Sequence, residues 1–281
     1  MSKGISLIIS NTGVTVTKKI LITGVSGLIG SAIWNWLNDK NAYDLYGLAR
    51  RFNPSERIDP SALPEIEDDH QYLVDITNFD EVLEASSDKD VIIHMAADPR
   101  GDAPWEIILK DNIIGTYNVF QAAKEAGAQR VIYASTVMVS WNYLSHEPYK
   151  SICDGLYDNV PPDFPIITKD MPVKPHDFYS SSKVLAESLA HKYSKLGISM
   201  LGLRIGGVNK ADRPADDGPA SPLWCSQRDV AQMVERCIEA NENLEYDIFY
   251  VLSNNRWRFM DIEHARRTIG YEPQDSTENF K

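Results

Sequence analysis

A glycine-rich segment at residues 23–30, Thr-Gly-Val-Ser-Gly-Leu-Ile-Gly, most constrains how this chain can fold. An apolar run at residues 20–22 precedes it and a helix-forming stretch at residues 31–37 follows it, so the order is strand, glycine turn, helix. Such a turn directs backbone N–H groups and the positive end of a helix dipole at one point, where a pyrophosphate can bind. The segment therefore predicts a dinucleotide-binding turn.

The three glycines of this turn have separate expected roles. Gly24 makes the tight turn, Gly27 lets the phosphates approach the backbone, and Gly30 lets the helix pack closely on the strand. The predicted cofactor contacts in this segment are Gly24, Ser26, Gly27, Leu28, Ile29 and Gly30.

Strand and helix signals alternate along the rest of the chain. Further strands are predicted at residues 43–49, 71–74, 90–95, 130–134 and 199–205, and helices at residues 112–126 and from residue 227 onward. Strands separated by helices require crossover connections, which predicts an α/β fold with a doubly wound parallel sheet. Ligands bind such sheets beyond the carboxyl ends of the strands.

Length and composition narrow the class of protein. The 281 residues suit a single domain at residues 19–281 after an N-terminal extension at residues 1–18. Without a membrane-length apolar stretch or a signal-peptide core, we expect a cytoplasmic protein. A formal charge of −12 disfavours nucleic acid and anionic membranes as partners. Neither the three cysteines nor the six histidines have metal-ligand spacing, so no metal is expected.

Polar residues after the predicted strands are candidate ligand contacts. Arg50 and Arg51 follow the second strand, where guanidinium groups suit the 2′-phosphate of NADP. A solvated pair of loop arginines is the alternative. Asp75 follows the third strand and suits the adenine amino group, or else caps a helix that begins near residue 78. The predicted cofactor is NADP, with NAD as the alternative.

A candidate catalytic group comes later in the chain. Tyr179 and Lys183 are four residues apart, so on a helix they share one face. A phenol has an ordinary pKa of about 10, but a nearby ammonium and a cationic nicotinamide both favour the phenolate. Thr136 follows the fifth strand and supplies a hydroxyl that can orient a substrate oxygen. These residues predict proton transfer coupled to hydride transfer.

Further short motifs accompany this group along the chain. They are Asp75-Ile76, the segment His94-Met95-Ala96-Ala97, Asn112 with Gly115-Thr116, Ser135-Thr136, and Arg204 in the segment 203–206. With the glycine turn, Tyr179 and Lys183, this combination resembles the extended branch of the short-chain dehydrogenase/reductase superfamily, the NAD-dependent epimerase/dehydratase family. The resemblance spans about residues 19–271.

The resemblance implies a Rossmann fold with a small C-terminal substrate-binding portion. It also implies that Tyr179 is the catalytic base or acid, that Lys183 lowers its pKa and contacts the nicotinamide ribose, and that Thr136 positions the reacting oxygen. The other implied cofactor contacts are Asp75, Ile76, Met95, Ala96, Ala97 and Asn112.

Within that family the chain resembles the uronate dehydrogenase-like members, which oxidise the anomeric carbon of a free sugar or sugar acid to a lactone. The matching stretches are residues 104–106, 112–118, 204–206 and 270–276. The substrate contacts expected on this basis are Asp98, Thr136, Val137, Gly207 and Arg213, and we expect a homo-oligomer, a dimer. The departures are Val137 in place of a substrate-contacting Asn, the longer segment 141–178, and Arg50-Arg51 in place of an acidic, NAD-selecting position.

Two segments are expected to form the substrate pocket. The proline-rich insert at residues 141–178 predicts a rigid, irregular lid, with a surface elaboration as the alternative. The loop at residues 209–224 carries Arg213, which suits a carboxylate or phosphate. A surface ion pair of Arg213 with Asp212, Asp216 or Asp217 is the alternative. Substrate-binding elements are therefore expected within residues 141–178 and 205–281.

Three functions fit these features. The favoured one is an NAD(P)-dependent sugar or sugar-acid 1-dehydrogenase. A nucleotide-sugar epimerase, dehydratase or reductase is the second, although only about 75 residues follow Ile205 to hold a nucleotide. The third is a non-catalytic, cofactor-sensing protein, which has no use for the Thr136, Tyr179 and Lys183 proton relay.

Overall fold

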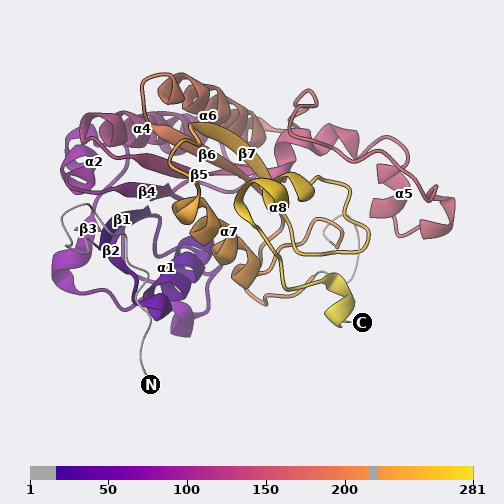
Figure 1. Ribbon diagram of the computed structural model, residues 1–281, viewed down its shortest axis with the longest axis horizontal. Helices are drawn as coiled ribbons and strands as arrows, with labels where there is room; N and C mark the ends of the chain where they lie inside the picture. Colours follow the sequence, from indigo (N-terminus) through magenta and orange to yellow (C-terminus); the bar gives the residue numbers. More distant parts are fainter. Residues whose placement is uncertain (1–16, 215–220, 281) are drawn as a thin grey trace.

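The computed structural model describes residues 17–214 and 221–280, and it is built around one seven-stranded sheet (Figure 1). The spatial order of its strands is β3-β2-β1-β4-β5-β6-β7, and every neighbouring pair is parallel. The strands are β1 Lys18–Thr23, β2 Tyr43–Ala49, β3 Gln71–Leu73, β4 Val91–His94, β5 Arg130–Thr136, β6 Ser199–Ile205 and β7 Tyr246–Val251. Because the strand order reverses between β1 and β4, the ligand-binding crevice of such a sheet is expected there.

Helices cover both faces of this sheet, which confirms the doubly wound α/β prediction (Figure 1). One layer contains α1 Leu28–Lys40, α7 Gln227–Glu239 and α8 Glu263–Ile269, and the other contains α2 Phe79–Ser86, α4 Gly115–Glu125 and α6 Phe178–Ser194. Ile20, Leu21 and Ile22 of β1 are fully buried, because a strand covered on both faces has no solvent side.

Several element boundaries differ from the sequence prediction. β3 ends at Leu73 and β4 at His94, one residue earlier than expected in each case, and β7 is not among the predicted strands. Lys18 already belongs to β1, and residues 1–16 of the expected N-terminal extension lie outside the described residues.

The helix expected at residues 112–126 begins earlier and is not regular throughout. It consists of α3 Trp105–Ile107, a π-helical segment η3 Ile108–Ile114, and then α4. Asp111 and Asn112 are consecutive residues of the π-helical segment, and both are buried. π-Helical turns are frequent at functional sites, and this one directs two polar side chains inward.

The insert at residues 141–178 is partly helical and is tied to the C-terminal part of the chain. It contains α5 Tyr149–Cys153, which projects at one end of the molecule (Figure 1). The Ile167 N–H donates to the Phe259 carbonyl over 2.8 Å, and the Tyr157 ring stacks on Trp257 with 4.4 Å between ring centres. These contacts anchor the insert, while its predicted role as a lid stays a prediction.

Candidate active site

The glycine turn lies between β1 and α1, beside the end of β2. Gly24 has a φ of +70°, and a Cβ at this position would lie 2.8 Å from the Ala96 nitrogen. At Gly30 a Cβ would lie 2.2 Å from the Gly24 carbonyl oxygen. Both positions therefore require glycine, the first for its conformation and the second for close packing of α1 on the turn.

The N-terminus of α1 is available to an anion. Its N-cap residue is Gly27, which has no side chain to accept a hydrogen bond from the first helical N–H groups. These N–H groups and the helix dipole are what a phosphate needs. The turn thus fits the pyrophosphate of a dinucleotide, with Ser26, Gly27, Leu28 and Ile29 as its predicted backbone contacts.

A buried histidine supports the turn from behind. The two ring nitrogens of His94 lie 2.9 Å from the Thr23 hydroxyl and 3.1 Å from the Thr116 hydroxyl, so His94 links β1, β4 and α4. The Thr23 hydroxyl also accepts a hydrogen bond from the Ala96 N–H. This arrangement holds the segment Met95-Ala96-Ala97, the predicted cofactor contacts after β4, beside the glycine turn.

The neutral state of His94 makes folding sensitive to acid. Burial, aided by the charge of Lys183, lowers the pKa of His94 from 6.5 to about 3. Between these pH values the unfolded chain binds a proton that the folded chain does not, so the free energy of unfolding falls as the pH drops below 6.5. Lowering the pH from 7 to 5 should therefore cost about 2 kcal/mol through this one group.

Urea unfolding at both pH values checks this prediction. In a His94→Gln variant, the change in the free energy of unfolding between pH 7 and pH 5 should be smaller by about 2 kcal/mol. In His191→Gln, a change at an exposed position, it should equal that of the wild type. An identical pH dependence in wild type and His94→Gln would contradict the assignment.

The three predicted catalytic residues come together at the carboxyl end of β5. Thr136 is the last residue of β5, and its hydroxyl lies close enough to the Tyr179 phenol to act on the pKa of that phenol. Tyr179 lies in the first turn of α6, where Asp177 and Ser180 form a capping box. The Lys183 Nζ lies one turn further along, 5.8 Å from the centre of the Tyr179 ring. The hydroxyl of the preceding residue, Ser135, donates to the Glu187 carboxylate further along α6.

Burial dominates the electrostatics of the pair. Burial raises the pKa of Tyr179 to about 12, although the nearby Thr136 hydroxyl and the charge of Arg57 act in the opposite direction. Burial also lowers the pKa of Lys183 to about 8. In the protein alone, removal of water thus outweighs the stabilisation of the phenolate expected from the sequence.

Asn112 connects the site to its surroundings through protein groups. Its side-chain amide donates to the Asp98 carbonyl over 2.9 Å and to the Ser182 hydroxyl over 3.3 Å, and its oxygen accepts from the Asp98 N–H. The Asp98 carboxylate pairs with Arg100 at 2.7 Å. Asn112 therefore fixes the loop after β4 against α6, and its predicted cofactor contact stays a prediction.

The residues expected at the adenosine end have protein partners. The Arg50 guanidinium lies 3.0 Å from the carboxylate of buried Asp111, so Arg50 is not simply solvated, while Arg51 is exposed. Asp75 accepts hydrogen bonds from the backbone and hydroxyl of Thr77, and these lower its pKa although burial opposes them. The N-cap of α2 is Asn78, so Asp75 does not cap that helix. Ile76, the next predicted contact, is buried.

The predicted substrate residues are only partly brought together. Val137 follows Thr136 directly and is buried, and Gly207 lies on the loop after β6, where its N–H donates to the Leu223 carbonyl. Arg213 is exposed, and among the described residues it makes no contact with Tyr179 or Thr136. The Asp212 carboxylate accepts from the Gln227 N–H instead of pairing with Arg213. Asp216 and Asp217 lie outside the described residues.

The sequence analysis did not identify two residues that lie near the site. Asp111 stands beside Asn112 in an apolar stretch, and a carboxylate in such a stretch is a signal for a buried ion pair. Arg57 lies in the long loop after β2, close enough for its charge to act on Tyr179. No local pattern marks it.

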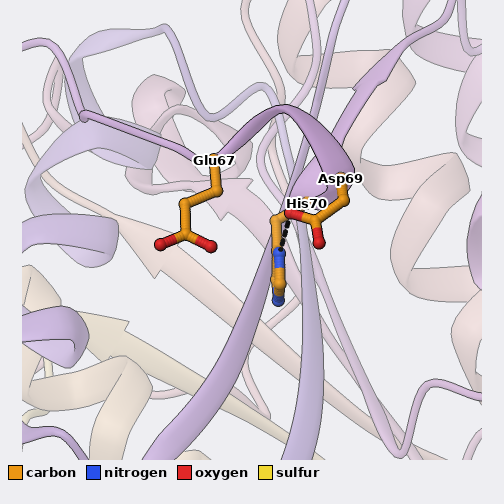
Figure 2. A group of neighbouring side chains, drawn as sticks. All are labelled: Glu67, Asp69 and His70. Carbon is orange, nitrogen blue, oxygen red and sulfur yellow. Dashed lines mark hydrogen bonds and ion pairs between the residues drawn. The ribbon is translucent and has the colours of Figure 1, made fainter.

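A group of potential metal ligands lies elsewhere, around the turn that precedes β3. Figure 2 shows its members, Glu67, Asp69 and His70. The His70 ring nitrogens lie 2.8 Å from Asp69 and 3.1 Å from Asp44, and these carboxylates raise the pKa of His70. Asp69 and Asp44 are therefore the carboxylate partners of this ring, and they form ion pairs with it when it is protonated.

Comparison with known proteins agrees with this geometry. Residues 20–209 match the model of the NAD-dependent epimerase/dehydratase family. The chain is 31% identical over 264 residues to NAD-dependent glucose-6-phosphate dehydrogenase of Haloferax volcanii, covering 93% of this chain and 95% of that one. It is 31% identical over 214 residues to L-arabinose 1-dehydrogenase (NAD(P)(+)) of the same organism, covering 73% and 82%. The crystal structure of glucuronic acid dehydrogenase from Chromohalobacter salexigens is similar with a TM-score of 0.73 and 27% identity, covering 94% and 87%.

Proposed function

The chain belongs to the NAD-dependent epimerase/dehydratase family, and from this premise we propose that it oxidises a free sugar or sugar acid at the anomeric carbon to a lactone. It is an oxidoreductase acting on a CH–OH group. The observation that carries the proposal is the meeting of Thr136, Tyr179 and Lys183 at the carboxyl end of the sheet, near the glycine turn.

The side chains provide a path for the proton in such an oxidation. The nicotinamide cofactor, when bound, supplies the acceptor for the hydride. The Thr136 hydroxyl and the Tyr179 oxygen, which lie near each other, can both bind the anomeric hydroxyl. Tyr179 accepts its proton, and the anomeric carbon loses its hydrogen as hydride and becomes the lactone carbonyl. Buried Lys183 places its positive charge beside the phenolate that must form first.

The packing after β6 and the known relatives favour a monosaccharide. Among the described residues after β6, α7, β7 and α8 pack against the sheet and complete it and its cover. The related enzymes named above act on glucose 6-phosphate, L-arabinose and glucuronic acid, none of which carries a nucleotide, and two of which are anionic. We infer that Arg213 binds the anionic group of an acidic substrate.

The cofactor is a nicotinamide dinucleotide, either NAD or NADP. The family is NAD-dependent, and one relative is named for both NAD and NADP. Preference for NADP through Arg50 and Arg51 stays a prediction, as does a homodimer. No helix in the described parts of the chain is long and apolar enough to cross a membrane.

A substrate screen tests this function. The enzyme is incubated with NAD or NADP and with glucuronate, glucose 6-phosphate, L-arabinose, glucose or UDP-glucose. Absorbance of the reduced cofactor measures turnover, and NMR identifies the product. We expect cofactor reduction with at least one free sugar or sugar acid and a lactone as the first product. Conversion of UDP-glucose alone, without net cofactor reduction, would instead indicate an epimerase.

A further inference from the structure

The ion pair between Arg50 and Asp111 lies where a dinucleotide fold distinguishes its cofactors. Arg50 is the first residue after β2, and the Gly24 N–H donates to the Leu48 carbonyl over 2.7 Å. Arg50 therefore leaves the sheet directly beside the glycine turn. In this fold, a residue near the end of the second strand contacts the adenosine ribose of the cofactor. A carboxylate at this position suits the 2′-hydroxyl of NAD, and an arginine suits the 2′-phosphate of NADP.

The two members of the pair differ in burial. The Asp111 side chain is 8% exposed and belongs to the π-helical segment, whose next residue, Asn112, is hydrogen-bonded to the loop after β4. The Arg50 side chain is 58% exposed and reaches Asp111 from the solvent side. Asp111 is thus the fixed member, and Arg50 is a side chain that can exchange one anionic partner for another.

The surroundings of Arg50 are rich in carboxylates. Its charge contributes to lowering the pKa values of Asp75 and Asp98, which follow β3 and β4. Those two carboxylates have further cationic partners, Lys110 at 3.5 Å and Arg100 at 2.7 Å. Among the described residues, Arg50 is the one cationic partner of Asp111. A dianionic 2′-phosphate that recruits Arg50 must therefore leave Asp111 unpaired.

We propose that Asp111 is a specificity-determining residue that competes with the 2′-phosphate of NADP for Arg50 and so shifts cofactor preference toward NAD. The 2′-hydroxyl of NAD carries no charge that attracts the guanidinium, so the Arg50–Asp111 pair can persist beside it. This proposal depends on the nicotinamide cofactor of the family and is independent of which sugar is oxidised.

Binding titrations of the full chain without any sugar test the proposal. The affinities for NAD, NADP and their reduced forms are measured by calorimetry and by nicotinamide fluorescence for wild type, Asp111→Asn, Arg50→Gln and the double variant. In Asp111→Asn, NADP should gain at least about tenfold in affinity relative to NAD, since one charge-assisted contact becomes free for the phosphate. In the double variant this gain should vanish, because Arg50 is absent.

The controls separate this competition from a general charge effect. Glu106→Gln removes the same charge from an exposed position on the preceding helix α3, and it should change the NADP-to-NAD affinity ratio less than about twofold. If the NADP-to-NAD affinity ratio of Asp111→Asn equals that of the wild type, the proposal is overturned. Arg50→Gln, at an exposed position, tests it even if the Asp111 variant does not fold. It should weaken NADP relative to NAD by about tenfold, and an unchanged ratio would overturn the proposal as well.

Discussion

Replacement of Tyr179 by Phe is expected to reduce turnover by a factor of at least about 100 while leaving cofactor affinity nearly unchanged. The variant removes one oxygen, the phenol oxygen that lies near the Thr136 hydroxyl. The aromatic ring stays in place, and Lys183 remains buried beside it. Because the proton of the substrate then has no acceptor at this position, the chemical step should slow without loss of binding.

The measurement combines single-turnover kinetics with a cofactor titration. Tyr193→Phe is the matched control, since Tyr193 lies on the same helix and its hydroxyl donates to Gln121, away from Thr136. The control should keep near wild-type turnover. Burial raises the pKa of Tyr179 to about 12, so turnover of the wild type in the direction of oxidation should also rise with pH. Wild-type turnover in Tyr179→Phe would exclude Tyr179 as the proton acceptor.

Replacement of Glu187 by Gln is expected to lower the free energy of unfolding by about 3–5 kcal/mol. The Glu187 carboxylate makes two 2.9 Å contacts with Arg204 and accepts from the Ser135 hydroxyl over 2.6 Å. The Arg204 side chain is only 2% exposed. Gln keeps one acceptor oxygen but carries no charge, so the buried guanidinium, which also donates to the Tyr250 hydroxyl, loses the negative charge that compensates it.

Denaturant unfolding measures this effect. Glu239→Gln is the control, because it breaks the exposed pair with Arg236, and it should cost less than about 0.5 kcal/mol. Tyr179, Lys183 and Glu187 recur every four residues on α6, so the salt bridge holds the helix face that carries the predicted catalytic pair. Equal stability of the two variants would mean that the Glu187–Arg204 pair contributes no more than a surface pair.

The parts of the site that could be predicted depend on neighbouring residues. The glycine turn follows from local sterics, because no side chain fits at Gly24 or Gly30. β1 and β4 follow from uninterrupted apolar runs, which are typical of strands covered on both faces. The shared face of Tyr179 and Lys183 follows from the helical repeat. In each case a few consecutive residues contain the whole physical cause.

The parts that could not be predicted depend on contacts between distant segments. Arg50 suggests a phosphate site by its position, but its carboxylate partner, Asp111, is supplied by a different helix. The π-helical turn that buries Asp111 is invisible to a pattern based on the ordinary helical repeat. β7 completes the sheet by pairing in parallel with β6, which precedes it by about 40 residues along the chain.

The sequence by itself therefore determined the order of the elements and the glycine turn, and it predicted a set of catalytic residues. Only the tertiary structure decided which charges are paired and which proton equilibria are shifted. The physical reason is range: steric and periodic constraints act within one or two turns of chain, whereas burial and ion pairing depend on which segments pack together. The Tyr179 pKa is one such case, since its main cause is the removal of water by packing.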